Sequence, residues 1–406
     1  MSEGRKRLLK ELIRQLHAGV SPEEVKEKFK QVLKEISPLE ISRIEQELIE
    51  EGMPREEIQR LCDVHLAVFR EQLERQKPPV ASENPVGILM EEHKILLGLL
   101  ENLLKIVNKV QETEEPHLAA EEIKHLRHLV EDLLDAEKHY LREENVLFPL
   151  LEKHGVREPP AIMWKEHDEI RDLKKKLHNL IEDYESMDFG DFKKELGETA
   201  TSLNSLLSSH IFKENNILFP TALRLVTEQE WTEALEDFDE IGYCCFTPTH
   251  LITKPKVKIE EPKAEAPTSE GLLQFETGTL SKEEIEAILN TLPVDITFVD
   301  AEDTVRYFNK AEGRIFVRTK SVIGRKVQMC HPQKSVHIVN KILDSFRSGK
   351  KDVAEFWIQM GERLVHIRYF AVRDKDGRYL GTLEVTQDLT DIKKIEGEKR
   401  LLDWKE

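Results

Sequence analysis

The chain has 406 residues, of which 60 are Lys or Arg and 78 are Asp or Glu, so its formal net charge is -18. At roughly 150 residues per domain this length predicts two or three domains, and so acidic a chain lacks the basic surface that nucleic acid requires. The four cysteines are scattered and no apolar run approaches the ~20 residues that span a bilayer. We therefore expect a cytoplasmic protein that is not an integral membrane protein, and the sequence leaves peripheral association with a membrane complex open.

Two proline-containing stretches divide the chain into three parts. Residues 77–85 read KPPVASENP, and residues 247–270 contain four prolines, mixed charges and no aromatic residue. Proline fixes φ and removes a backbone donor, so such runs favour extended spacers. The predicted parts are a helical domain over 1–76, a bundle over 85–245, a linker over 247–270, an α/β domain over 275–395 and an exit helix over 392–406.

The first part has the pattern of an all-α domain. Apolar residues recur at intervals of three and four, at Leu8, Leu9, Leu12, Ile13 and Leu16. Two start signals follow, Ser21-Pro22-Glu23-Glu24 and Ser37-Pro38-Leu39-Glu40, each with a serine cap and a proline in the first turn. Gly52 ends one helix and Pro54 opens the next. The pattern predicts four short helices.

Cysteines occur near two domain ends. Cys62 and His65 are three positions apart on a predicted helix, where a thiol and an imidazole could bind metal or haem or report redox state. Packing of a buried cysteine beside an unrelated histidine is the more frequent arrangement. Cys244 and Cys245 follow the bundle, and for them packing is the first interpretation and redox sensing the second.

The second part contains long amphipathic patterns over 86–110, 119–153, 160–186 and 191–224, and a further helix starts at Thr227. Four long helices with short connections predict an antiparallel four-helix bundle.

An internal repeat lies within this bundle. Residues 139–149, HYLREENVLFP, align without gaps on residues 210–220, HIFKENNILFP. Each copy contains His-x-x-x-Glu, which places both groups one turn apart on the same helix face. The helix before each copy carries a Glu-His pair, at Glu92-His93 and Glu166-His167. The bundle is therefore predicted to consist of two related hairpins.

Six ionisable residues of the repeat continue apolar stripes and so point into the bundle. They are His93, His139, Glu143, His167, His210 and Glu214. Burying them without compensation is prohibitive, whereas metal coordination uses the carboxylate charge and the nitrogen lone pairs together. A ligand set without sulfur favours iron or manganese over structural zinc or an iron–sulfur cluster. If both glutamates bridge two metals, each metal has two histidines and two carboxylate oxygens.

Three more glutamates adjoin these residues, namely Glu92, Glu144 and Glu166. They could support the ligands from outside, but most helical glutamates are solvated, and we expect these to be at the surface.

On these motifs, residues 85–225 resemble the hemerythrin-like family, often called the HHE cation-binding domain. The resemblance implies that the six residues hold a non-haem di-iron site. The chain departs from the oxygen-carrying hemerythrins at two places. Arg171 stands where they have a further histidine, and the last motif has Glu214 at i+4, followed by Asn215, where they have Asp at i+5. The symmetric set is more similar to that of regulatory and iron-sensing members.

The third part has segments rich in β-branched and aromatic residues over 296–299, 304–308, 353–360, 363–373 and 379–387. Hairpin turn signals separate them, and helical patterns lie near 310–316 and 332–348. We expect a mixed α/β domain with an antiparallel sheet.

Three short motifs of this part resemble the PAS domain, over about 275–395. They are Phe308-Asn309-Lys310-Ala311, Val322-Ile323-Gly324-Arg325 and Asp388-Leu389-Thr390, in the order in which PAS domains have them. The resemblance implies a sensor domain that dimerises or passes a signal to a partner through its exit helix. Cys330, His331 and His337 lie where some PAS sensors place a haem ligand, so haem or another small ligand is a hypothesis, with packing or surface exposure as the alternative.

The order of the three parts resembles a prokaryotic family in which a helical domain of unknown function precedes hemerythrin-like and PAS domains. No phosphate-binding loop, nucleophile elbow or basic recognition helix occurs in the sequence. We therefore expect a sensor, rather than an enzyme, with two iron ions that bind or respond to O2, NO, redox state or iron. The PAS domain relays the change to a protein partner. The alternatives are a di-iron enzyme acting on NO, peroxide or ferrous iron, and metal or oxygen storage.

Overall fold

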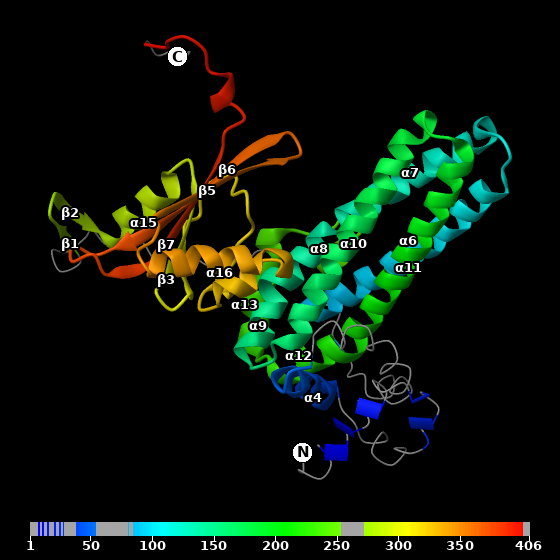
Figure 1. The fold of residues 1–406 in the computed structure, drawn as a ribbon, viewed down its shortest axis with the longest axis horizontal. Helices are drawn as coiled ribbons and strands as arrows, with labels where there is room; N and C mark the ends of the chain where they lie inside the picture. The colour runs from blue at the N-terminus through cyan, green and yellow to red at the C-terminus, as the bar shows by residue number, and fades with distance from the viewer. Residues whose placement is uncertain are drawn as a thin grey trace. The chain divides into compact units, whose positions relative to one another are not determined.

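The computed structural model describes residues 38–53, 80, 84–252 and 272–400, together with isolated positions between residues 7 and 27. The chain forms two compact units, Met1–Pro255 and Lys256–Glu406. The first unit is helical and the second contains a five-stranded antiparallel sheet (Figure 1). This confirms the predicted fold classes. Among the described helices, none has the length and apolar character needed to cross a membrane.

The N-terminal part is described mainly through α4 (Pro38–Glu50). The helix begins at the predicted signal and ends before Gly52, whose φ of 102° favours glycine. Ile44 and Leu48 of α4 are buried in one cluster with bundle residues such as Leu147 and Phe219, so this helix packs directly on the bundle. The other helices predicted here, together with Cys62 and His65, lie largely outside the described residues.

Four helical columns form the bundle, as predicted. The first is α6 (Pro85–Glu112) and the third is α10 (Glu158–Asp183). The second consists of α7 (Ala120–Asp135), α8 (Glu137–Arg142), the π-helix η2 (Glu143–Leu147) and α9 (Phe148–Lys153). The fourth consists of α11 (Phe189–Lys213), the π-helix η4 (Glu214–Leu218) and α12 (Phe219–Leu225). Leucine-rich stripes on the four columns form the core of the bundle away from α4.

Both π-helices occur at the same point of the internal repeat, and each is followed by Phe-Pro. A proline has no N–H and its ring collides with the carbonyl four residues earlier, which disfavours a regular α-helix there. The repeat supplies a second stabilising feature, because Asn145 and Asn216 donate their side-chain amides to the carbonyls four residues earlier, at 2.9 and 2.7 Å. The sequence thus imposes a wide turn that begins at Glu143 in one copy and Glu214 in the other.

After the bundle, α13 (Glu228–Ile241) begins after Thr227, as predicted, and has a capping box. The backbone N–H of Glu230 donates to the Thr227 hydroxyl at 3.3 Å, and the Glu230 carboxylate accepts from the backbone N–H of Thr227 at 3.0 Å. The same carboxylate accepts from Lys153 at 2.7 Å and from His154 at 2.8 Å. These bonds fix α13 to the end of α9. Residues 242–248 then lead to the short helix α14 (Thr249–Ile252).

The sheet of the second unit has the strand order β4-β3-β7-β6-β5, with every neighbouring pair antiparallel. The strands are β3 (Asp295–Asp300), β4 (Val305–Phe308), β5 (Val353–Met360), β6 (Arg363–Arg373) and β7 (Tyr379–Asp388). All five were predicted, as was the helix α16 (Gln333–Arg347). The hairpin of β1 (Leu272–Phe275) and β2 (Gly278–Ser281) and the helix α15 (Lys282–Thr291) precede the sheet and were not predicted.

The helix predicted near 310–316 is wrong, because this segment is an irregular loop. Its backbone groups bond to side chains instead of to each other. Arg314 donates to the carbonyls of Asn309 and Phe316, both at 2.9 Å, and Asp295 accepts from the N–H of Ile315 at 2.7 Å. Such side-chain bonds compete with helical ones.

The described part of the predicted exit helix is a single 3-10 turn, η8 (Ile392–Lys394), and residues 395–400 are not helical. Ile395 is 73% exposed, so the segment buries no apolar face. A helix this short needs such packing to be stable.

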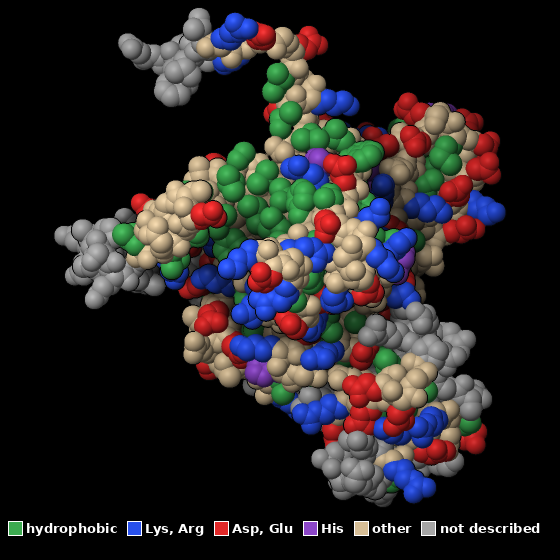
Figure 2. Space-filling model, turned by 60° about the vertical axis from the view of Figure 1, so that its left-hand side comes forward, with side chains coloured by type: hydrophobic (Ala, Val, Ile, Leu, Met, Phe, Trp, Pro, Cys, Tyr) green, Lys and Arg blue, Asp and Glu red, His purple; other side chains and the backbone are tan. Residues whose placement is uncertain are grey.

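Strand β5 is an edge strand that pairs only with β6 among the described strands. Hydrophobic side chains gather on the face of the second unit that Figure 2 shows. Large apolar residues of β5 are exposed, among them Val353, Phe356 and Trp357, the last at 68%. An apolar edge of this kind is suited to contact with another protein surface.

Replacing Glu230 with Gln is expected to loosen α13 in a pH-dependent way. Burial raises the pKa of Glu230, but the bonds from Lys153, Thr227 and His154 outweigh it and lower that pKa to about 2. The stabilisation is therefore full above the ordinary value of 4.5 and is lost as the pH falls toward 2. Urea unfolding should show a loss of about 1–3 kcal/mol at pH 7 and roughly half that loss or less at pH 3.

The exposed Glu233 of the same helix provides the control, because Glu233→Gln should leave the unfolding free energy unchanged at both pH values. An equal loss at pH 7 and pH 3 for Glu230→Gln would contradict the role of the carboxylate charge.

Candidate metal centre

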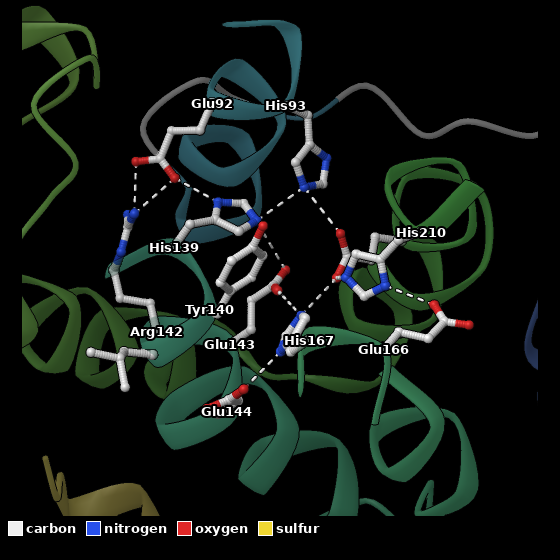
Figure 3. A network of polar contacts seen from close by, with 12 residues as sticks. Glu92, His93, His139, Tyr140, Arg142, Glu143, Glu144, Glu166, His167 and His210 are labelled. Atoms are coloured by element: carbon white, nitrogen blue, oxygen red, sulfur yellow. Dashed lines mark hydrogen bonds and ion pairs between the residues drawn. The ribbon is translucent and has the colours of Figure 1, made fainter. Parts of the chain in front are cut away.

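The six predicted residues converge at one place in the bundle (Figure 3). His93 comes from α6, His139 from α8, His167 from α10 and His210 from α11, and the two glutamates are the first residues of the π-helices. None of the six side chains is more than 1% exposed. The periodicity and the repeat therefore located a fully buried polar cluster.

The cluster divides into two groups that share both glutamates. One group contains His93 and His139 with Glu143 and Glu214, and the other contains His167 and His210 with the same glutamates. Within each group the candidate ligand atoms all lie within 4.8 Å of one another. Two cations could therefore lie side by side, each beside two imidazoles, with both carboxylates between them.

The distances show how each glutamate faces both groups. The two oxygens of Glu143 lie 3.6 Å from Nε2 of His139 and 3.2 Å from Nε2 of His167. Those of Glu214 lie 3.1 Å from Nε2 of His93 and 2.9 Å from Nε2 of His210. Ligand atoms about 2.1 Å from a shared ion are roughly 3 to 3.5 Å apart. The spacing fits a pair of bridging carboxylates.

Several of these close atoms make no hydrogen bond with one another. Both oxygens of Glu143 and of Glu214 and the Nε2 atoms of His167 and His210 are buried without a hydrogen-bond partner. Buried polar atoms in native proteins are nearly always satisfied. These atoms point to a common centre instead of toward each other, as ligands of a cation do, so the residues present fit a metal site.

Each histidine is oriented by a bond at its other ring nitrogen. Nδ1 of His139, His167 and His210 lies 2.7 to 2.8 Å from a carboxylate, supplied by Glu92, Glu144 and Glu166 respectively. Nδ1 of His93 lies 3.0 Å from the side-chain oxygen of Asn215. Carboxylates that bond in this way fix the tautomer and aim Nε2 at the metal.

The expected surface position of Glu92, Glu144 and Glu166 is wrong, because all three are buried, at 0%, 4% and 1% exposure. A residue next to a core position on a helix usually faces outward. Here each of the three glutamates lies between two columns and bonds to a histidine of the neighbouring column. The repeated Glu-His pair was the signal that could have identified two of them.

Each outer carboxylate also carries a cationic partner. Arg142 contacts Glu92 at 2.7 Å, Arg171 contacts Glu144 at 2.8 Å, and Lys213 contacts Glu166. Burial raises the pKa of Glu92, but the bonds and charges of His139 and Arg142 outweigh burial and lower this pKa to about 2. The carboxylates therefore stay ionised. Arg171, at the position where oxygen carriers have a histidine, thus supports an outer carboxylate.

A tyrosine and a lysine that lie beside the centre were not predicted from the sequence. The Tyr140 ring lies 4.5 Å from that of His167 between centroids, and Lys174 donates to the Tyr140 hydroxyl at 3.0 Å. Burial lowers the pKa of Lys174 to about 7. The amine of Lys174, which can gain or lose a proton near neutral pH, is thus separated from the candidate ligand His167 only by the side chain of Tyr140.

The candidates in the second unit do not form a comparable cluster. Cys330 is buried among Val299, Val305 and Val322, while Nδ1 of His331 lies 2.8 Å from the carbonyl of Val327. His337 is exposed on α16. Groups of three or more candidate metal ligands occur only in the bundle, within the part of the chain that the structure describes. Cys244 is buried, Cys245 is exposed, and both are free thiols.

Comparison with known proteins gives a match for each of the three parts. Residues 9–75 match a family of unknown function (DUF438), residues 84–222 the hemerythrin HHE cation binding domain, and residues 285–390 the PAS domain. No curated protein matches the chain.

Three solved structures are similar to part of the chain. The C-terminal domain of a protein from Streptococcus mutans is 36% identical, covers 31% of this chain and 97% of its own, and has a TM-score of 0.30. A sensory box sensor histidine kinase from Vibrio cholerae is 12% identical, with 26% and 89% covered and a TM-score of 0.21. The PAS domain of a protein from Colwellia psychrerythraea is 15% identical, with 27% and 97% covered and a TM-score of 0.22.

A divalent metal is expected to stabilise the first unit, because it supplies partners for buried atoms that lack them. At free Mn2+ one hundred times above its Kd, each site adds about 2.7 kcal/mol to the free energy of unfolding. Calorimetry of the whole chain, with and without Mn2+, should show a higher Tm in its presence.

Two glutamine variants sharpen this test. Glu214→Gln should abolish most of the Mn2+ shift, whereas Glu230→Gln should have a lower Tm but keep the shift. A wild-type Tm that does not respond to Mn2+ or to Fe2+ would contradict a metal centre.

Proposed function

Because this chain belongs with the proteins that join a helical domain of unknown function, a hemerythrin HHE domain and a PAS domain, we propose that it is a di-iron sensor. The bundle holds two iron ions and responds to O2, NO, redox state or iron supply. The PAS domain relays this response to a protein partner or a second copy. The observation that carries the proposal is the pair of buried ligand groups that share Glu143 and Glu214.

The donor chemistry supports iron. Four imidazole nitrogens and two carboxylates, without a thiolate, suit iron or manganese. When bound, such a metal pair supplies coordination positions for a small ligand and electrons that can be gained or lost. The chain's own residues hold the imidazoles in one tautomer and keep their Nε2 lone pairs directed at the centre.

The closed surroundings support a small effector. The rings of Phe148 and Phe219 stack on His167 and His93, with centroids 5.7 and 5.3 Å apart, and Tyr140 packs on the same cluster. With six ligand side chains at most 1% exposed, the site excludes bulk water and any substrate that needs an open cleft. A diatomic molecule needs no such cleft.

The π-helices support transmission of a change at the centre. Each begins at a bridging glutamate and contributes apolar residues, Leu147 from η2 and Leu218 from η4, to the buried cluster that also contains Ile44 of α4. Helix α4 packs directly on η4. A shift of Glu214 would therefore reach α4 through direct packing, and a shift of Glu143 would reach it through the shared cluster. Packed interfaces tend to switch between discrete arrangements, so a small shift at one site can become a larger one at another.

A second candidate function is enzymatic turnover of NO, peroxide or ferrous iron. The observation that favours it is Lys174, whose pKa burial lowers to about 7, in contact with Tyr140 beside the centre. A buried amine that titrates near neutral pH is a group that enzymes use for proton transfer.

Metal analysis of the intact chain, purified without oxygen, tests the di-iron site. We expect about two irons per chain, and Glu143→Ala should lose both together because it bridges them. Glu101→Ala, on the exposed face of α6, should keep both. One iron that survives Glu143→Ala would contradict the shared site.

Titration of the loaded chain with O2 and with NO then separates the two candidate functions. A sensor should react stoichiometrically and change the amide hydrogen exchange of regions outside the bundle. Repeated turnover with an electron donor, without such a change in exchange, would favour the enzyme and overturn the sensor.

A further inference from the structure

The two halves of the repeat hold their outer carboxylates differently. Glu166 accepts bonds from His210 and Lys213. Glu92 accepts the corresponding bonds from His139 and Arg142, and it also accepts a third, from the hydroxyl of Thr247 at 2.5 Å. Thr247 lies beyond the residues 84–222 that match the hemerythrin HHE domain. One ligand of the centre is thus supported from outside that domain.

Thr247 ends a short exit segment, residues 242–247, that is anchored along its length. The Cys244 thiol lies 3.7 Å from Nη2 of Arg142. The ring centroid of Tyr243 lies 4.9 Å from Cζ of the same arginine. The backbone N–H of Cys245 bonds to Asp135. Arg142 and Asp135 belong to the second column, as His139 does, so these contacts of the exit segment lie on the side of the cluster that holds His139.

The position of Thr247 makes it part of the site. Its side chain is only 4% exposed, and its backbone N–H donates to the Cys244 carbonyl at 3.0 Å. A hydroxyl bonded to a buried carboxylate makes a charge-assisted bond. Glu92 in turn bonds to Nδ1 of His139 at 2.7 Å, so the bonds run without a break from the exit segment to a ligand.

We propose that the exit segment is a positioning element for the metal ion at His93 and His139, and that metal binding in turn stabilises residues 242–252, through which the chain leaves the bundle. The inference rests on the proposed metal centre. Coupling between two sites is reciprocal, so a segment that strengthens a metal site is itself stabilised by the metal. α14 starts two residues after Thr247, within the predicted linker over 247–270.

The test uses the full-length chain with Mn2+ as the probe and three variants. Thr247→Val removes the hydroxyl and keeps the shape, and Thr247→Ser restores the donor. Thr199→Val is the matched control, because Thr199 is equally buried, at 2% exposure, and its hydroxyl has no hydrogen-bond partner. It lies on α11 about three turns from His210.

Two readouts are followed, the Mn2+ binding isotherm and the amide hydrogen exchange of residues 242–252. In wild type, Thr247→Ser and Thr199→Val, we expect Mn2+ to slow this exchange several-fold. In Thr247→Val we expect one of two binding steps to weaken by about tenfold, as for other supporting groups around metals. The other step should be unchanged, and exchange in 242–252 should no longer respond to Mn2+.

Equal exchange in metal-free and loaded wild type would overturn the inference, and so would a Thr247→Val variant that matches Thr199→Val in both readouts. Equal weakening of both binding steps would overturn it as well, because the segment touches only one half. These outcomes all occur with metal bound, whereas failure of the proposed function would appear as absence of binding in wild type.

Discussion

The burial of two carboxylates and four imidazoles in one helical bundle is the constraint on which the rest of this structure depends. Ionisable groups with at most 1% exposure need partners for every polar atom. The chain supplies them at Nδ1 of each histidine and leaves Nε2 of His167 and His210 and the oxygens of Glu143 and Glu214 facing a common centre. Nε2 of His93 and Nε2 of His139 lie 3.1 Å apart at the same place. The wide turns of the two π-helices start at these glutamates, and the outer carboxylates and their cations close the cluster around them.

The charges of the cluster explain why protons and metal ions compete for it. Three outer carboxylates face three cationic side chains, namely Arg142, Arg171 and Lys213, so the uncompensated charge belongs to the two inner glutamates. Burial lowers the pKa of His93, His167 and His210, but the carboxylates around them outweigh it and raise that pKa. In a metal-free bundle, protons on these imidazoles would be the charges that balance the inner glutamates. A metal must displace those protons, so its affinity falls as the pH falls.

The sequence identified the six central residues because helix periodicity and the repeat are local patterns. It missed what depends on the packing of columns against each other. Glu144 was expected at the surface because most helical glutamates are solvated, whereas it bonds to His167 of α10 and is buried. The loop at Arg314 was expected to be helical because its composition allows a helix, whereas bonds to distant side chains decide its shape. Thr247 bonds to a residue 155 positions away, and no local pattern could reveal that.

The repeat explains why the exit segment matters. Two similar hairpins build a centre whose halves correspond, although Arg142 stands in one half where Lys213 stands in the other, and Glu144 where Asn215 stands. In a fully symmetric centre, a change in ligation would affect both halves equally and would not act on one flanking segment more than on another. The hydroxyl of Thr247 breaks this equivalence at Glu92, on the side from which the chain leaves toward the linker. A change in ligation at His139 therefore alters the support of the exit segment directly, while the same change at His210 reaches it only through the bundle core.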